Sequence, residues 1–167
     1  MCAFCKTLEP GLRDLRPSRI FFNTKNDQFF LDGSALPDSK TLRGDNETAA
    51  FLSARAADGE ECTEGDTVWQ VGCVLLALVC GKSPFLRNRL ARTLLAIEEC
   101  DAELSGAGNL KEACEEILEA MKNARDLNDF EKRLGKLGDG NSRNDKSGPV
   151  AETSPKQVEN TSSAVEH

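Results

Sequence analysis

The sequence predicts a mainly helical domain that carries one small β-hairpin and covers residues 1–137. An apolar run at residues 68–80 ends at a glycine, which is typical of a buried helix with its C-terminal cap. Three stripes of apolar residues at helical spacing follow this run. Two short aromatic runs precede it, at residues 20–22 and 29–31, and are typical of β-strands.

The hairpin is the first expected element. Its strands are the runs Ile-Phe-Phe and Phe-Phe-Leu, and the polar stretch at residues 23–28 predicts a longer connecting loop. Residues 32–55 are rich in Gly, Ser, Asp and Ala and show no clean period, so we expect a loop there.

The helices come next. Residues 68–80 are apolar on nearly every face, Gly81 follows as the C-cap, and Ser83-Pro84 prevents the helix from continuing. Each of the three later stripes indicates core packing by an amphipathic helix. The stripes are Leu86, Leu90, Leu94 and Ile97; Leu110, Cys114, Ile117, Leu118 and Met121; and Leu127, Phe130, Leu134 and Leu137.

Residues 138–167 have a different composition from the rest of the chain. Gly, Ser, Asn, Asp, Lys, Glu and Thr dominate there, and large apolar residues nearly vanish. Such a segment buries too little apolar surface to offset its ordering entropy, so we expect a disordered acidic and polar tail.

The overall composition disfavours several classes of function. A net charge of −7 without a Lys/Arg cluster disfavours nucleic-acid binding, because an acidic surface repels phosphates. No apolar run is long enough to cross a membrane and no signal pattern is present, so we expect a cytoplasmic protein. Cys2 and Cys5 have zinc-knuckle spacing, but no second pair follows and His167 is the single histidine. We therefore expect no metal and no other cofactor.

One segment near the N-terminus carries a family resemblance. Residues 13–19 read Arg-Asp-Leu-Arg-Pro-Ser-Arg, which resembles the protein kinase catalytic loop, His-Arg-Asp-Leu-Lys-Pro-x-Asn. Leu12 occupies the His position and Arg19 the Asn position. The resemblance places Asp14 where a kinase orients the substrate hydroxyl, although Arg13-Asp14 is equally consistent with a structural salt bridge. Arg19 offers no acceptor and would repel Mg²⁺, but it could bind a phosphate or a carboxylate.

A second motif follows at the expected distance. Asp32 lies eighteen residues after Asp14, where kinases carry Asp-Phe-Gly, but Gly33 replaces the Phe. The resemblance makes Asp32 the counterpart of the metal-binding Asp. The alternative, that Asp-Gly is simply a turn after a strand, is favoured because so much else departs from the kinase pattern.

Later motifs support the fold rather than activity. Residues 51–55 resemble the Tyr-x-Ser/Ala-Pro-Glu that ends an activation segment, with Arg55 at the Glu position. Residues 67–73 resemble Asp-Val-Trp-Ser-Leu-Gly-Cys at the start of the buried C-lobe helix. Trp69 and Gly72 are retained there as fold anchors, and we expect the Trp69 indole to be mostly shielded from water. Thr67 replaces the Asp that would fasten the catalytic loop.

The resemblance covers about residues 12–137 and implies a protein kinase C-lobe-like domain without an N-lobe, since thirteen residues before Asp14 cannot supply an ATP site. We therefore expect a pseudokinase-like interaction or regulatory module that binds a protein partner. It is similar to the kinase non-catalytic C-lobe class, which binds helical segments of partners. One alternative is a fragment of a longer Ser/Thr kinase, an ATP-dependent phosphotransferase. An enzyme of another class is disfavoured, because the expected domain has no histidine.

Overall fold

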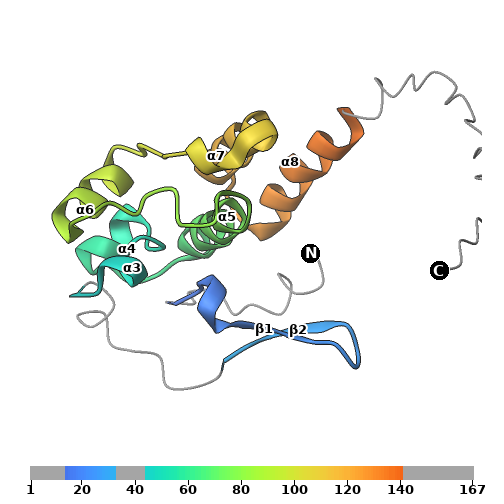
Figure 1. Ribbon diagram of the computed structural model, residues 1–167, viewed down its shortest axis with the longest axis horizontal. Coiled ribbons are helices and arrows are strands. Elements are labelled where there is room, and N and C mark those ends of the chain that lie inside the picture. The colour runs from blue at the N-terminus through green and yellow to red at the C-terminus, as the bar shows by residue number, and fades with distance from the viewer. Residues whose placement is uncertain (1–13, 33–43, 141–167) are drawn as a thin grey trace, which may run out of the picture.

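The computed structural model describes residues 14–32 and 44–140. It is mainly helical and has one two-stranded antiparallel sheet, which confirms the predicted fold class at that level (Figure 1). The described elements are the 3₁₀ helix η1 (Pro17–Arg19), strands β1 (Ile20–Asn23) and β2 (Gln28–Leu31), helices α3 (Asn46–Ala49), α4 (Ala54–Asp58), α5 (Glu64–Cys80) and α6 (Leu90–Glu98), the 3₁₀ helix η2 (Ser105–Leu110), and helices α7 (Lys111–Asn123) and α8 (Leu127–Gly140).

The hairpin has the predicted strands. Ile20 pairs with Leu31, and the next two pairs along the ladder are Phe21 with Phe30 and Phe22 with Phe29. The turn closes with Asp27 at φ 52°, a left-handed conformation that Asp tolerates better than most residues. The Asn23 side-chain oxygen accepts a hydrogen bond of 3.0 Å from the Lys25 amide, which further stabilises the turn.

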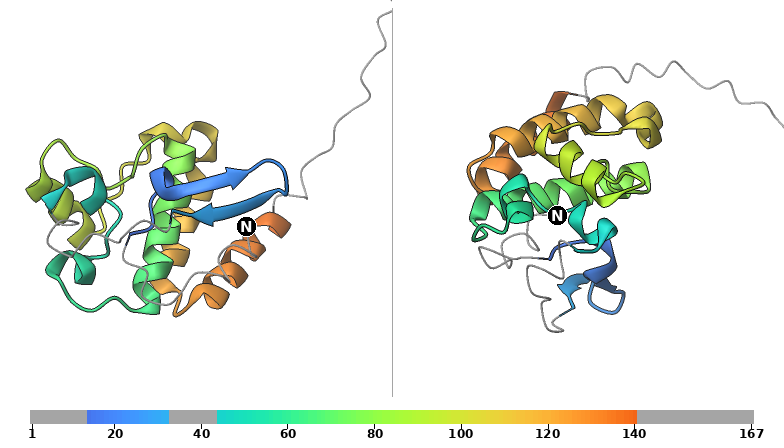
Figure 2. Two further views of the ribbon diagram at one scale, coloured as in Figure 1. Left: turned by 90° about the horizontal axis from the view of Figure 1, so that it is seen from below. Right: turned by 90° about the vertical axis from the view of Figure 1, so that its left-hand side faces the viewer.

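Helix α5 occupies the middle of the molecule. Helices α3, α4 and α6 group on one side of it, α7 and α8 on another, and the hairpin lies on a third (Figures 1 and 2). Gly81 ends the helix at φ +80°, as predicted for a C-cap. The helix is buried on most of its surface, but Leu78 is 69% exposed, which departs from the expectation of burial all round.

Two close approaches set how α5 packs against the α7 side. A methyl group on Gly72 would lie 2.7 Å from the Met121 sulfur, so a side chain at position 72 would collide with α7. A methyl group on Gly106 in η2 would lie 2.3 Å from the carbonyl oxygen of Cys80. Glycine is therefore needed at both positions, because the backbone there lies too close to a neighbouring element to leave room for a side chain.

Helices α3 and α4 both begin within residues 32–55, where we expected a loop. The Asp45 carboxylate accepts from the Thr48 amide at 2.9 Å and caps α3, while Ser53 Oγ accepts from the Ala56 amide at 3.1 Å and caps α4. Side-chain caps of this kind are local and stabilise single helical turns. Helices of four and five residues are too short to show a hydrophobic period, which is why the pattern indicated a loop.

The three amphipathic helices are confirmed. Helix α6 begins at Leu90, so Leu86 lies before it, and Leu110 belongs to η2 and is exposed. Helix α8 runs to Gly140, past the domain boundary expected at residue 137. The remainder of the expected tail, residues 141–167, lies outside the described residues.

Candidate functional site

The centre of the candidate site is the carboxylate of Asp14, whose side chain is 2% exposed. Arg19 Nη1 donates to Oδ2 at 2.7 Å, and Arg16 Nη2 donates to the same oxygen at 3.3 Å. Arg16 Nε forms an ion pair with the other oxygen, Oδ1, at 3.0 Å. Asp14 therefore faces two guanidinium groups, those of Arg16 and Arg19, while Arg13, the partner that the sequence suggested, lies outside the described residues.

Arg19 also joins the two ends of the hairpin. Its Nη2 donates to the backbone oxygen of Asp32 at 2.8 Å, and the Asp32 amide donates to the Arg19 backbone oxygen at 2.9 Å. The Arg19 side chain is 9% exposed, so one buried guanidinium connects the Asp14 loop to the residue after β2. Arg19 does bind a carboxylate, as the sequence allowed, and that carboxylate is Asp14.

A hydrogen-bond chain leads from this centre to α3. Arg16 Nη1 donates to Thr48 Oγ1 at 2.6 Å, and the Thr48 hydroxyl in turn donates to the Asp45 carboxylate. The Thr48 hydroxyl and amide lower the pKa of Asp45 below its ordinary value, so Asp45 stays ionised as the end of the chain. Thr48 carries no distinguishing pattern in the sequence, because it lies in a segment where a loop is expected.

Gln70, and not Thr67, fastens the Asp14 loop to α5. The amide of Leu15 donates to Gln70 Oε1 at 3.3 Å, and Gln70 is fully buried. Thr67 is also fully buried, but its hydroxyl donates to the Thr63 carbonyl of its own helix at 3.5 Å. A glutamine inside an otherwise apolar run was the signal in the sequence, because a buried amide side chain requires a polar partner.

Arg55 lies on the surface and not in the core. It is exposed and forms an ion pair of 2.9 Å with Glu60. Its charge reversal relative to the kinase pattern therefore places no unpaired charge in the core. The nearby buried anion is Asp66, which accepts from Ser53 Oγ at 2.5 Å and from the Thr63 amide at 2.7 Å. Burial alone would raise the pKa of Asp66, but these hydrogen bonds outweigh it and the pKa is lowered.

Trp69 lies at the edge of the main core. Its ring stacks on the fully buried Phe85, with ring centroids 5.0 Å apart. The indole is partly buried, and its Nε1 is shielded from water without a hydrogen-bond partner among the residues that the structure describes. Both proposed anchors therefore contact packed neighbours, Trp69 through its ring and Gly72 through its close approach to Met121.

The hairpin carries the largest concentration of exposed aromatic residues in the described part of the chain. Phe21 and Phe30 stack with centroids 5.6 Å apart, and Phe22 and Phe29 lie 4.8 Å apart. Because neighbouring residues of a strand point to opposite faces, each face of the hairpin carries one pair. The four side chains are between 45% and 53% exposed. This hairpin surface, Phe21, Phe22, Phe29 and Phe30, was predicted as a pair of strands but not as exposed.

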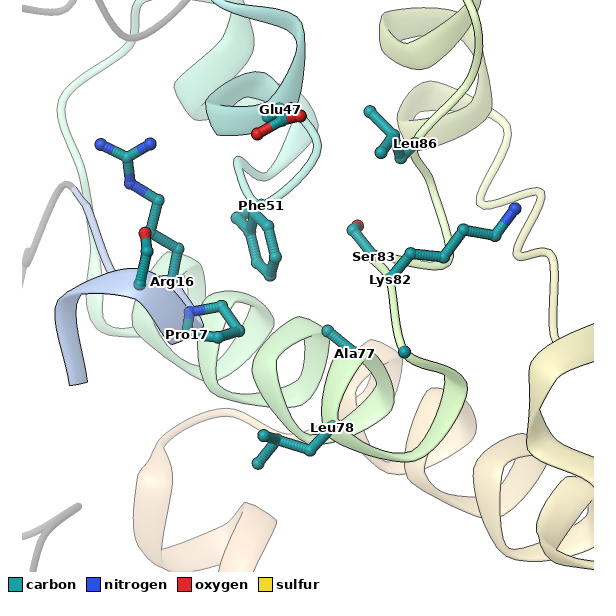
Figure 3. A pocket seen from close by; sticks show the side chains of 11 residues that line it. Arg16, Pro17, Glu47, Phe51, Ala77, Leu78, Lys82, Ser83 and Leu86 are labelled. Atoms are coloured by element: carbon teal, nitrogen blue, oxygen red, sulfur yellow. The ribbon is translucent and has the colours of Figure 1, made fainter. Parts of the chain in front are cut away.

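A hollow of about 530 Å³ lies between η1, α3 and the C-terminal end of α5. Figure 3 shows the Phe51 ring within it, with the charged ends of Arg16 and Lys82 pointing to opposite sides. Arg16 is paired with Asp14, and Lys82 with Glu103 at 3.2 Å. The hollow therefore has an apolar part formed by Phe51, Ala77 and Leu78, two paired cations, and one carboxylate, that of Glu47, in its lining.

Several predicted positions lie outside the described residues. Leu12, Arg13 and Gly33 are among them, as are Cys2 and Cys5. Within residues 14–32 and 44–140 no three His, Cys, Asp or Glu side chains group as metal ligands. No helix of that same part is long and apolar enough to span a membrane.

Comparison with known proteins adds no relative. No protein-family model matches this chain, and no curated protein matches it. Its function is therefore inferred from its own residues.

Proposed function

We propose that this chain is a non-catalytic module of protein kinase C-lobe type that binds another protein. The observation that carries this proposal is the Arg19 guanidinium, which lies between the Asp14 carboxylate and the Asp32 backbone. The resemblance places the magnesium-binding and substrate-orienting groups of a kinase at these three positions. Here the Arg19 guanidinium donates to the Asp14 carboxylate and to the backbone oxygen of Asp32.

The chemistry of this arrangement opposes phosphoryl transfer. That reaction depends on metal ions that neutralise the charge developing on the phosphates. Arg19 places a fixed positive charge beside the Asp14 carboxylate and the Asp32 backbone, and it has no oxygen to offer a cation. The Asp14 side chain is buried and accepts from two guanidinium groups, so a substrate hydroxyl has little access to its carboxylate.

The hairpin surface supports the binding half of the proposal. Exposed aromatic residues that cluster on one element are typical of interaction sites, because phenylalanine contributes a large apolar area with little loss of side-chain freedom. The strands themselves carry no charge, and the Arg19 contacts fix the base of the hairpin. The non-catalytic C-lobe class that this chain resembles binds helical segments, so the proposed occupant is an apolar face of a partner helix.

The catalytic half is tested by nucleotide binding. ATP is titrated with and without Mg²⁺ while the melting temperature is followed, and no shift is expected. Real binding at a hundredfold excess over Kd would stabilise the protein by about 2.7 kcal/mol, which is easily detected. A shift that requires Mg²⁺ would contradict the proposal.

The binding half is tested by capture from a cell extract with a matched pair of variants. Phe22→Ser with Phe29→Ser removes one aromatic pair, and Leu95→Ser on α6 removes an apolar side chain of the same exposed fraction, 49% for both Phe22 and Leu95. We expect the hairpin variant to lose a partner that the Leu95 variant keeps, with both melting near the parent protein. Equal retention by the two variants would exclude the face of the hairpin that carries Phe22 and Phe29, and the same comparison with Phe21→Ser and Phe30→Ser tests the other face.

A further inference from the structure

Two thiols face each other where α5 meets α7. The close approaches of Gly72 to Met121 and of Cys80 to Gly106 show that the α7 side runs antiparallel to α5. Cys80 lies eight residues after Gly72, and Cys114 lies seven residues before Met121. At about 1.5 Å of rise per residue, both cysteines reach the same level of the helix pair.

The burial of the two residues is unequal. Cys114 is fully buried in the core, whereas Cys80 is half-buried at the last position of α5. Burial raises the pKa of Cys114, and the nearby Cys80 thiol raises it further, which is the effect expected of two thiols in contact. Cys80 is thus the thiol that a small molecule reaches, and Cys114 is buried behind it.

We infer that Cys80 and Cys114 form a redox-sensitive pair, which a low-molecular-weight disulfide such as oxidised glutathione converts into a disulfide that locks α5 onto α7. In the first step the Cys80 thiolate attacks one glutathione sulfur, forms a mixed disulfide and releases one glutathione thiolate. In the second step the Cys114 thiolate attacks the Cys80 sulfur, forms the protein disulfide and releases the second glutathione thiolate. The two protein thiols are oxidised, the glutathione disulfide is reduced, and the released thiolates take up the two protons.

The burial of Cys114 makes the second step slow at neutral pH, because burial raises the pKa of the Cys114 thiol and the thiolate is the attacking species. The pair therefore responds to sustained oxidation. The closed bond spans the two helices that carry much of the core, so it stabilises the fold and leaves the hairpin surface untouched.

The test incubates the full chain with oxidised glutathione, blocks the remaining thiols and maps the tryptic peptides by mass spectrometry. Residues 56–82 and 112–122 form separate peptides that contain Cys80 and Cys114, while Cys100 falls in residues 93–111 and Cys2 and Cys5 in residues 1–6. The expected product is peptide 56–82 joined to peptide 112–122 with the loss of two hydrogens. The oxidised protein is expected to melt several degrees higher than the reduced protein.

Two serine variants identify the thiol within peptide 56–82, which also contains Cys62 and Cys73. Cys80→Ser is expected to abolish the cross-link, whereas Cys62→Ser keeps it, because Cys62 packs in a separate small cluster with Leu52 and Ala56. Absence of the cross-link in the parent protein, or its persistence in Cys80→Ser, would overturn the inference. Since the readout is the covalent link itself, it does not depend on any partner or nucleotide.

Discussion

At position 19 a guanidinium stands where the catalytic-loop resemblance places a neutral amide. The exchange has a structural effect as well as a chemical one, because Arg19 holds Asp14 and the end of β2 in the same contact. An asparagine side chain is too short to make both contacts at once. The residue that replaces this amide therefore also fixes the hairpin.

Arg19→Ala is expected to destabilise the protein strongly. Removing one partner of a buried ion pair costs about 3–5 kcal/mol, and the lower end applies because Arg16 still faces Asp14. The measurement is urea unfolding, with Arg55→Ala as control, since that arginine forms an exposed pair with Glu60 worth about 1 kcal/mol or less. If both variants lose the same small amount, the Arg19 contacts do not stabilise the fold.

Gln70→Leu probes the contact that holds the Asp14 loop on α5. Leucine is similar in size to glutamine, but it leaves the buried Leu15 amide without its hydrogen-bond acceptor. Loss of this hydrogen bond costs about 1–3 kcal/mol. Hydrogen exchange gives a local readout, because the Leu15 amide is expected to exchange much faster in the variant. Unchanged exchange at Leu15 would show that the loop is held by other contacts.

At the scale of single elements, the strength of the sequence pattern decided what could be predicted. Helix α5 and its Gly81 cap are apparent from one long apolar run, and the hairpin from two aromatic runs. Helices α3 and α4 were missed because they depend on single capping residues. The exposure of the hairpin phenylalanines was also not predictable, since β-strand patterns do not show what covers a strand.

The candidate site was predictable in part. The motif singles out Asp14 and Arg19, but the salt bridge stated as an alternative was that of Arg13 with Asp14, and Arg13 lies outside the described residues. The role of Gln70 and the contact between Arg16 and Thr48 depend on packing between segments more than thirty residues apart in the sequence. No local pattern encodes such a contact, so neither contact could be predicted.

Gly72→Ala tests the close approach of α5 to α7. Alanine gains about 1 kcal/mol in helix propensity over glycine, but its methyl group would lie 2.9 Å from Met121 Cβ, which is tied to the backbone. Overpacking costs about 1–3 kcal/mol, so we expect a net loss of stability in urea unfolding. Gly135→Ala in α8 is the control, because open space surrounds that position and only the gain in propensity remains. A stabilised Gly72 variant would contradict the packing described.

At the scale of the whole molecule, stability depends on carboxylates that the fold keeps ionised. The pKa values of Asp45 and Asp66 are both lowered from the ordinary 3.8. Groups with lowered pKa values contribute stability above the unfolded-state pKa and lose it as pH falls through the folded-state value. We therefore expect the free energy of unfolding to be level above about pH 5 and to fall below about pH 4.

Asp66→Asn tests one contributor to this acid sensitivity. The variant is expected to be less stable than the parent protein at pH 7, and the difference is expected to narrow toward pH 3, where the parent carboxylate becomes protonated. Thermal melts across this range give the stability of each protein as a function of pH. A difference in stability that stays constant with pH would show that the Ser53 and Thr63 contacts do not favour the ionised form of Asp66.

The exposed phenylalanines of the hairpin have a consequence for solubility. Such a surface promotes self-association, and the net charge of −7 opposes it by mutual repulsion between copies. This repulsion vanishes near the isoelectric point of about 4.9, at a pH where the carboxylates that stabilise the fold are still largely ionised. The folded protein is therefore expected to be least soluble near that pH, and turbidity there should decrease in the variant that replaces Phe22 and Phe29 with serine.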